Sequence, residues 1–255
     1  MHLSWAALSH PGLRRSVNED TWAARPDLGF FIVADGMGGH AAGEIASRLA
    51  ADVIEAFVIQ TASADRHQTW PFPYEPSVSL NANRLKAAFR LANRGIAARA
   101  AEAADLRGMA TTACALLTDD GSVSVAHVGD SRVYLYRGGV LQQVTRDHSW
   151  VEEQVRAGVM SATAAREHPW RNVVTRALAG GEDPEVDVVD LALQPGDRLL
   201  LCSDGLSGTV PHDELARHLA TGGDLARLCE GLVEAANAAG GPDNITVLVL
   251  HADVG

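Results

Sequence analysis

The chain has 255 residues, of which 47% are hydrophobic and 21% are charged. These proportions are typical of a globular protein, and the length fits one large domain, or one domain with a subdomain. The 21 Lys and Arg residues stand against 32 Asp and Glu residues, so the formal net charge of −11 argues against a nucleic-acid partner, which needs a basic face.

The sequence also argues against membrane insertion and disulfide bonding. No apolar run approaches the roughly 20 residues that span a bilayer, and the N-terminal segment lacks the basic and apolar regions of a secretory signal. We therefore expect a cytoplasmic protein. The cysteines are odd in number and show no CxxC spacing, which predicts reduced thiols in the core; they are Cys114, Cys202 and Cys229.

Strand-like and helical patterns succeed one another in the first half of the chain. Strands are predicted at 3–8 and 30–34, and a helix is predicted at 42–60. The helix is indicated by apolar residues at helical spacing, namely Ile45, Leu49, Val53 and Phe57. Residues 61–79 carry three prolines and predict a long surface connection whose aromatic residues pack down, before a second helix at 80–104.

The second half is richer in strands. Short β-rich runs between residues 109 and 144 are broken by Gly-containing turns, which indicates antiparallel hairpins. A polar, irregularly helical stretch follows at 147–176. The later predicted elements are strands at 186–191, 198–202 and 245–251 and helices at 212–219 and 224–239. Antiparallel strands with helices in pairs predict an α+β sandwich.

Four aspartates lie where strand-like runs meet Gly, Ser or Asn turns; they are Asp35, Asp130, Asp204 and Asp243. If they converge, their repulsion favours protonation unless cations bind between them. Gly36 is expected to let the backbone turn so that its carbonyl points the same way as the carboxylate before it. Carboxylate and carbonyl oxygens suit Mg²⁺ or Mn²⁺, so the pattern predicts a multinuclear site for hard ions.

Other ligand sites fit less well. Gly36, Gly38 and Ala41 satisfy G-x-G-x-x-A, which is a dinucleotide-binding pattern. However, Asp35 would face the pyrophosphate, and no βαβ unit follows. There is no Cys/His cluster with zinc spacing and no EF-hand loop, so zinc and calcium-loop sites are disfavoured.

Six short motifs occur in order along the chain: RSVNED at 15–20, DGMGGH at 35–40, GMATT at 108–112, GDSR at 129–132, SDG at 203–205 and DN at 243–244. Together they resemble the metal-dependent protein serine/threonine phosphatases, the type 2C or PPM family, in its compact bacterial branch. The resemblance implies a single domain over residues 1–255. Its expected fold is a four-layer α-β-β-α sandwich of two central, mostly antiparallel sheets flanked by helix pairs, with a small flap subdomain at about 147–176.

The resemblance also implies a set of metal ligands. Asp35 is expected to bridge two ions, with Asp204 and Asp243 completing the first site. The Gly36 carbonyl and Glu19, the latter through water, are expected to serve the second site. The implied cofactors are two Mn²⁺ or Mg²⁺ ions and a third, weaker ion.

Further roles follow from the same resemblance. The third ion is expected between Asp130 and Asp204, with Asp20 in the outer shell of the cluster. Arg15 matches the arginine that grips the substrate phosphate. Many eukaryotic members place a histidine directly after the Asp-Gly pair; here the nearest histidine is His40, which is a candidate for general acid or phosphate contact against a structural or water-binding role. Metal-bound water is the other candidate proton donor.

The predicted reaction is hydrolysis of phosphoserine and phosphothreonine on proteins. One general acid or base accelerates a reaction only about 10²–10⁴-fold, far short of what phosphate-monoester hydrolysis needs. Two ions roughly 3.5–4 Å apart can share a water, lower its pKa and aim it at phosphorus. A eukaryotic-like Ser/Thr kinase is the implied partner of a monomeric enzyme. The alternatives are a non-catalytic phosphoprotein- or kinase-binding module on the same fold, and a regulatory phosphatase acting on an anti-sigma-type partner.

The remaining polar residues have structural interpretations. Arg132 is interpreted as an ion-pairing residue and His127 as a packed core histidine, whereas His148 receives no role. Trp150 and Trp170 lie in the predicted flap, where packing is the default and reading of a phosphopeptide is the alternative.

Overall fold

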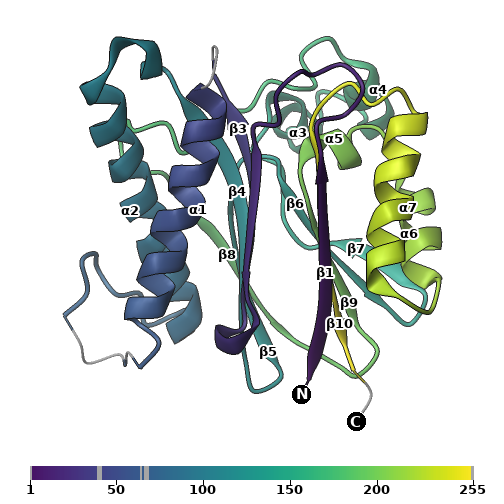
Figure 1. The fold of residues 1–255 in the computed structure, drawn as a ribbon, viewed down its shortest axis with the longest axis horizontal. Coiled ribbons are helices and arrows are strands. Elements are labelled where there is room, and N and C mark those ends of the chain that lie inside the picture. Colours follow the sequence, from purple (N-terminus) through teal and green to yellow (C-terminus); the bar gives the residue numbers. More distant parts are fainter. Residues whose placement is uncertain (1, 39–41, 64, 66–68, 254–255) are drawn as a thin grey trace.

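Two antiparallel five-stranded sheets lie face to face at the centre of the molecule (Figure 1). The computed structural model describes residues 2–38, 42–63, 65 and 69–253. The first sheet has the order β1-β10-β9-β6-β7, with bounds Leu3–His10, Ile245–Ala252, Arg198–Cys202, Arg132–Arg137 and Val140–Gln143. The second sheet has the order β2-β3-β4-β5-β8, with bounds Asp20–Arg25, Phe30–Met37, Ala110–Asp119, Ser122–Val128 and Asp187–Ala192.

Helix pairs cover the outer faces of the two sheets (Figure 1). Helices α1 (Ala42–Gln60) and α2 (Leu80–Glu102) pack on the second sheet, and α6 (His212–Ala220) and α7 (Leu225–Ala238) pack on the first. This arrangement confirms the predicted four-layer sandwich. Within the described part of the chain, no helix is both long and apolar enough to cross a bilayer.

The central strand β3 shows how the layers are joined. Phe30 and Ile32 face the helices, whereas Phe31 and Val33 face the opposite sheet, and all four side chains are buried. A strand covered on both faces reads as a continuous apolar run, which is why the sequence predicted it so clearly. Burying each such side chain contributes about 1.5–3 kcal/mol, so β3 is a rigid support for whatever follows it.

Helix α1 has the predicted bounds but a different buried face. Its most deeply buried side chains include Ala46, Ala50 and Ile54, whereas the predicted apolar stripe is only partly buried apart from its last member. Val53 of that stripe faces α2, where a Cβ at Gly95 would lie 3.6 Å from its Cγ2. Small residues therefore pack this helix, and the larger ones also serve the contact between the two helices.

The sequence analysis missed one strand and one α-helix. Strand β2 is an edge strand with half-exposed residues at its end, so it lacks a clear alternating pattern. Helix α5 (Asp204–Ser207) is a single turn, too short to show periodicity. Other predictions were confirmed: the three cysteines are buried and free, and Trp70 and Phe72 of the connection 61–79 pack against the core.

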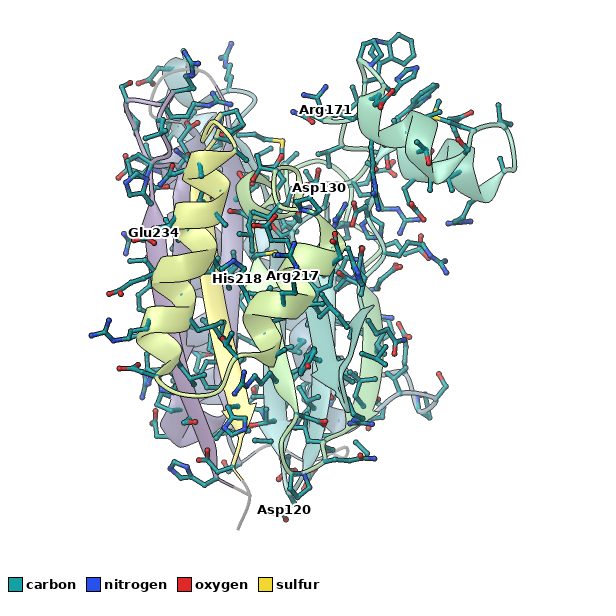
Figure 2. The ribbon with its side chains drawn as sticks, turned by 90° about the vertical axis from the view of Figure 1, so that its right-hand side faces the viewer. Asp120, Asp130, Arg171, Arg217, His218 and Glu234 are labelled. Carbon is teal, nitrogen blue, oxygen red and sulfur yellow. The ribbon has the colours of Figure 1, made fainter. Side chains whose placement is uncertain are left out.

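The stretch between β7 and β8 projects from one end of the sandwich. It contains two short helices, α3 (Trp150–Arg156) and α4 (Ala162–Glu167). Figure 2 shows Arg171 on this projection and Asp130 at the same end of the sandwich, with Asp120 at the opposite end. The boundaries 147–176 for a flap subdomain remain a prediction.

Candidate metal centre

The acids singled out from the sequence come together at one end of the sandwich. Asp130 lies two residues after β5, Asp204 begins α5 two residues after β9, and Asp243 lies two residues before β10. Asp35 lies within β3, where its Cα pairs with that of Asp20 on β2. Both sheets therefore contribute acids to the same place.

The electrostatics show that these carboxyl groups act on one another. Burial and then the charges of Asp20, Asp204, Asp130 and Asp243 raise the pKa of Asp35 well above its usual value. Four like charges act on one buried carboxyl, which favours its protonated form unless cations balance the charges.

Asp130 and Asp204 show the same effect. The pKa of Asp130 is raised to about 7, first by burial and next by the charge of Asp204. The pKa of Asp204 is raised by burial and by Asp243, while a hydrogen bond with Asp35 and the charge of Arg132 oppose the rise. The Asp35 and Asp204 carboxyl groups are thus within hydrogen-bonding reach of each other.

The carboxylate of Asp20 accepts hydrogen bonds from two hydroxyl groups. Ser203 Oγ and Thr246 Oγ1 donate to its Oδ2 at 2.8 and 2.7 Å. Its other oxygen, Oδ1, is buried and has no hydrogen-bond partner among the described residues. The pKa of Asp20 is raised to about 7, chiefly by burial, although the two hydroxyl donors act in the opposite direction. A carboxylate with one oxygen fixed by hydrogen bonds and the other oxygen available can bind a metal ion directly or accept a hydrogen bond from a metal-bound water.

Glu19 shows a similar unpartnered oxygen. Its backbone N–H donates to Asn244 Oδ1 at 2.8 Å, and its side-chain Oε1 is buried with no hydrogen-bond partner in residues 2–38, 42–63, 65 and 69–253. Burial raises the pKa of the Glu19 carboxyl. Gly43, at the start of α1, has no room for a side chain because a Cβ there would lie 2.4 Å from that Oε1.

The predicted turn at Gly36 is wrong. Gly36 lies inside β3, where its Cα pairs with that of Thr111 on β4. A glycine is required for a different reason: a Cβ would lie 2.1 Å from the Gly43 carbonyl oxygen and 2.7 Å from the Glu19 carbonyl oxygen. The residue therefore permits the close approach of β2, β3 and the start of α1 that gathers the acids.

Arg15 lies at the rim of the acid cluster. Its Nη2 donates to Asp243 Oδ2 at 2.7 Å, and its side chain is 52% exposed. The hydrogen bond to Asp243 raises the pKa of the guanidinium, and the charges of Glu19 and Asp204 add to that rise. A cation with exposed donors thus stands beside the cluster. His40 lies outside the described residues.

The residues present fit hard divalent cations. Two buried carboxylate oxygens, Glu19 Oε1 and Asp20 Oδ1, lack hydrogen-bond partners in the part of the chain that the structure describes, and the neighbouring acids repel one another. All the donors are oxygens, which is the set that Mg²⁺ and Mn²⁺ prefer. The individual ligand roles remain predictions.

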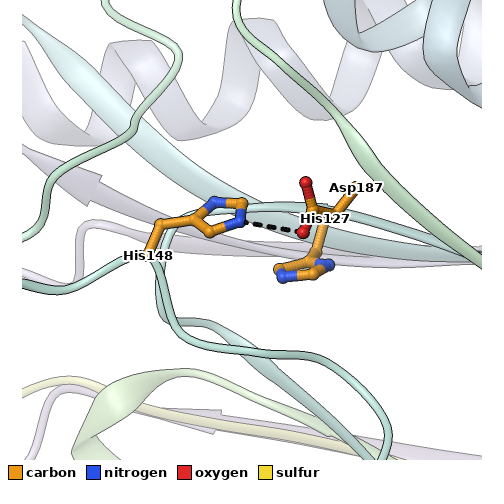
Figure 3. A group of neighbouring side chains, drawn as sticks. All are labelled: His127, His148 and Asp187. Atoms are coloured by element: carbon orange, nitrogen blue, oxygen red, sulfur yellow. Dashed lines mark ion pairs between the residues drawn. The ribbon is translucent and has the colours of Figure 1, made fainter. Parts of the chain in front are cut away.

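A second polar cluster was not detected from the sequence. His127, His148 and Asp187 lie together (Figure 3), and His148 accepts a hydrogen bond from Gly129, the residue before Asp130. His127 is a buried histidine, and its Nε2 donates to the Arg146 carbonyl at 2.7 Å. His148 is also buried, and nothing in its sequence context signalled a partner because the three residues lie on separate segments.

The interpretation of Arg132 as an ion-pairing residue is confirmed. Its guanidinium donates to both carboxylate oxygens of Asp147, at 2.6 to 3.0 Å, and to the Tyr134 hydroxyl at 2.9 Å. Trp150 and Trp170 pack edge to face with ring centroids 4.9 Å apart, although Trp170 is 55% exposed.

Comparison with known proteins gives a consistent result. A family model described as protein phosphatase 2C matches residues 13–245. The serine/threonine phosphatase Stp of Listeria monocytogenes is 39% identical over 226 residues, which are 88% of this chain and 84% of that protein. The serine/threonine protein phosphatase PstP of Mycobacterium tuberculosis is 42% identical over 248 residues, which are 97% of this chain and 44% of that protein.

Solved structures agree with the sequence matches. The crystal structure of Mycobacterium tuberculosis PstP superposes with a TM-score of 0.86 at 38% identity and covers 99% of both chains. A structure of the PstP catalytic domain in complex with two manganese ions superposes with a TM-score of 0.81 at 36% identity, over 99% of both chains. Both PstP structures are thus similar to this chain over 99% of its residues.

Proposed function

This chain belongs to the protein phosphatase 2C family and is a serine/threonine phosphatase, and we propose that it removes phosphate from phosphoserine and phosphothreonine on proteins with divalent ions held by its acid cluster. A divalent-metal requirement is supported by the family and by the two manganese ions of the PstP structure. Mn²⁺ or Mg²⁺ is the expected ion, since both take oxygen ligands.

One observation carries the proposal: the buried carboxyl of Asp35 is surrounded by four further aspartates whose charges all raise its pKa. Such an arrangement costs free energy unless protons or cations balance it. Strongly perturbed acids gathered in one place also mark functional sites more often than structural ones. The cluster is therefore best explained as a place where cations bind.

Within the cluster we assign unequal roles. Asp35 would bridge two ions, with Asp204 and Asp243 on the first, and the Gly36 carbonyl and Glu19 on the second. Asp35 suits the bridge because the charges of all its acidic neighbours act on it. Glu19 suits contact through water because its Oε1 is buried but unpartnered.

The outer positions complete the assignment. Asp130 would help to hold a third, weaker ion together with Asp204, whose charge acts on it directly. Asp20, fixed through one oxygen by two hydroxyl donors, would lie in the outer shell and orient water through its other oxygen.

The bound ions would supply a metal-activated water as the nucleophile and would offset the charge on the phosphoryl group. Arg15 would bind the substrate phosphate through its planar fork of N–H donors, which matches phosphate oxygens in pairs. Its half-exposed position at the rim supports that role. His40 is proposed as the general acid or as a phosphate contact.

Partners and setting follow from the reaction. Phosphorylated proteins are the substrates, and an opposing eukaryotic-like Ser/Thr kinase would make them, which places the enzyme in signal transduction. We expect a monomer that acts in the cytoplasm. These assignments rest on the family resemblance.

The test is hydrolysis of a phosphothreonine peptide with and without Mn²⁺. Asp204→Asn and Asp243→Asn should abolish metal-stimulated hydrolysis while leaving the circular dichroism spectrum unchanged. Glu234→Gln is the matched control, because it removes one negative charge from an exposed position on α7 (Figure 2) and should keep full activity.

The outcomes separate the two functions. Full activity in either aspartate variant would overturn the assignment of the acid cluster as the metal centre. Tight binding of the phosphopeptide by the wild type, without turnover at any Mn²⁺ concentration, would instead favour the non-catalytic binding module.

A further inference from the structure

The flap, defined here as residues 149–175, is closed at its base by backbone hydrogen bonds. The Trp150 N–H donates to the Val173 carbonyl at 2.9 Å, and the Thr175 N–H donates to the His148 carbonyl at 2.8 Å. His148 is thus the last residue before the flap, and Arg176 is the first residue after it. Contacts that position His148 and Arg176 therefore position both ends of the flap.

His148 also grips the loop that carries Asp130. Its backbone N–H donates to the Gly129 carbonyl at 2.9 Å, and the Gly129 N–H donates back to His148 Nδ1 at 3.1 Å. Gly129 has a φ of +106° and lies against β4, where a Cβ would come within 2.3 Å of Thr112 Cβ. With no side chain of its own, Gly129 depends on these two hydrogen bonds and its packing for its position.

The other ring nitrogen of His148 faces Asp187, which also contacts Arg176 at the end of the flap. His148 Nε2 lies 3.4 Å from Asp187 Oδ2, and Arg176 Nη1 donates to Asp187 Oδ1 at 3.2 Å (Figure 3 shows the histidine contact). The histidine contact is longer than an ordinary hydrogen bond, and the buried Nε2 has no other partner among the described residues. Asp187 therefore contacts both His148, before the flap, and Arg176, after it, and its contact with His148 is the longer of the two.

The hydrogen bonds define the tautomers of both histidines. A backbone N–H can only donate, so His148 Nδ1 must accept and its proton lies on Nε2. A carbonyl can only accept, so the proton of His127 also lies on Nε2, which faces the Arg146 carbonyl. Burial lowers the pKa of both imidazoles, which keeps them neutral near pH 7.

This geometry argues against a metal ion shared by the cluster. The His127 and His148 rings are stacked, with centroids 4.7 Å apart and planes inclined by only 20°. A metal lies in the plane of each imidazole that binds it, and two nearly parallel planes at this spacing do not meet at one ion. His148 Nδ1 is already engaged, and metal binding at Nε2 would remove its remaining proton.

We propose that His148 is a positioning residue of the phosphatase, which couples the flap to the metal-binding loop through the two sides of one ring. Nδ1 accepts from Gly129 and so positions the neighbouring Asp130. Nε2–H contacts Asp187, which binds Arg176, so the residue that follows the flap is held to the same histidine. The inference rests on the proposed function in one respect, the role of Asp130 as a metal ligand.

Two substitutions separate the two sides of the ring. Asparagine places its side-chain oxygen near the position of Nδ1, so His148→Asn keeps an acceptor for Gly129 but loses the contact with Asp187. Glutamine reaches the position of Nε2, so His148→Gln keeps the Asp187 contact but loses the acceptor. Each variant is the control for the other.

The first readout is amide hydrogen exchange in the metal-free full chain. His148→Gln should raise the exchange rate of the Gly129 amide about three- to tenfold, the range expected for the loss of one hydrogen bond. His148→Asn should leave Gly129 within about twofold of the wild type and instead raise the exchange of Thr175. Equal effects of both variants on Gly129 would overturn the proposal in favour of packing alone.

The second readout needs no variant. Nitrogen-15 spectra of the wild type distinguish the two neutral tautomers, and we expect the proton of His148 on Nε2. A proton on Nδ1 would contradict the hydrogen bond to Gly129 and overturn the proposal, even if a variant failed to fold.

The third readout links the result to the metal. The Mn²⁺ concentration for half-maximal hydrolysis should rise several-fold in His148→Gln and remain at the wild-type value in His148→Asn. An unchanged Mn²⁺ dependence in His148→Gln would overturn the link to Asp130. If the wild type does not hydrolyse phosphoproteins, the proposed function fails, whereas the exchange and tautomer results on His148 still stand.

Discussion

The buried carboxyl of Asp20 makes the stability of the metal-free protein depend on pH. Its pKa is raised from 3.8 to about 7, a difference of about 3 units, chiefly because it is buried. At about 1.4 kcal/mol per unit this corresponds to about 4 kcal/mol. An acid with a raised pKa stabilises the folded state below its unfolded pKa, and this contribution is lost as the pH rises through the folded value. Between about pH 4 and pH 7, the free energy of unfolding should therefore fall.

The assay is urea unfolding in EDTA at a series of pH values from 4 to 8. Asp20→Asn is the informative variant, because its amide oxygen can still accept from Ser203 and Thr246 but cannot ionise. His127 and His148 act in the opposite direction, since their lowered pKa values remove stability as the pH falls below about 6.5. Both histidines remain in the variant, so their contribution cancels, and the difference between wild type and variant reports Asp20 together with its effect on the neighbouring Asp35.

We expect that difference to change by about 4 kcal/mol between the two ends of the pH range. Saturating Mn²⁺ should reduce the change, because cations balance the charge that protons otherwise neutralise. Parallel curves for wild type and Asp20→Asn would refute the reasoning, since they would show that this carboxyl has the same pKa in the folded and unfolded chain.

Three other changes test separate parts of the structure. Arg132→Ala leaves the carboxylate of Asp147 without its paired donors and should lower the free energy of unfolding by about 3–5 kcal/mol in urea titrations. Gly36→Ala forces a methyl group against the Gly43 carbonyl, so it should destabilise the protein by about 1–3 kcal/mol and weaken Mn²⁺ binding in calorimetry. Trp170→Ala removes a half-exposed ring and should change the free energy of unfolding by no more than about 1 kcal/mol; a larger loss would show that the ring supports the flap.

The sequence predicted the acid cluster because each aspartate stands beside a long apolar run. Such runs identify buried strands, and the short polar motifs at their ends mark which residues emerge at the edge. It did not predict β2, whose register places Asp20 opposite Asp35. That register depends on pairing across the sheet, and β2 itself has too few buried residues to show a pattern.

Gly36 illustrates a second limit. From the sequence, a glycine after an aspartate at the end of a strand indicates a turn, because glycine is the usual residue there. The structure keeps Gly36 in the strand and explains it by the 2.1 Å that would separate a Cβ from the Gly43 carbonyl. Close approach between segments is invisible to local patterns.

His148 illustrates a third. Its partners Gly129 and Asp187 lie on different segments, and neither a motif nor a periodicity links them. His127 could be interpreted as a core histidine from the sequence, because side chains alternate between the two faces of a strand and this local pattern places it inward. Long-range polar pairs therefore remain the part of the site that requires a structure.

Among the described residues outside the acid cluster, two acids with little exposed side-chain surface are paired with arginines. Asp197 has a side chain that is 2% exposed and accepts from Arg137 at 2.8 and 2.6 Å, and Asp147 is held in the same way by Arg132. These two acids are thus paired with arginines, as is usual for an acid that is buried for structural reasons. Around Asp35 the nearest charges that perturb it most are all negative. Because the buried Asp197 has an arginine partner, the unbalanced negative charge around Asp35 is best explained by a cation that the chain does not itself provide.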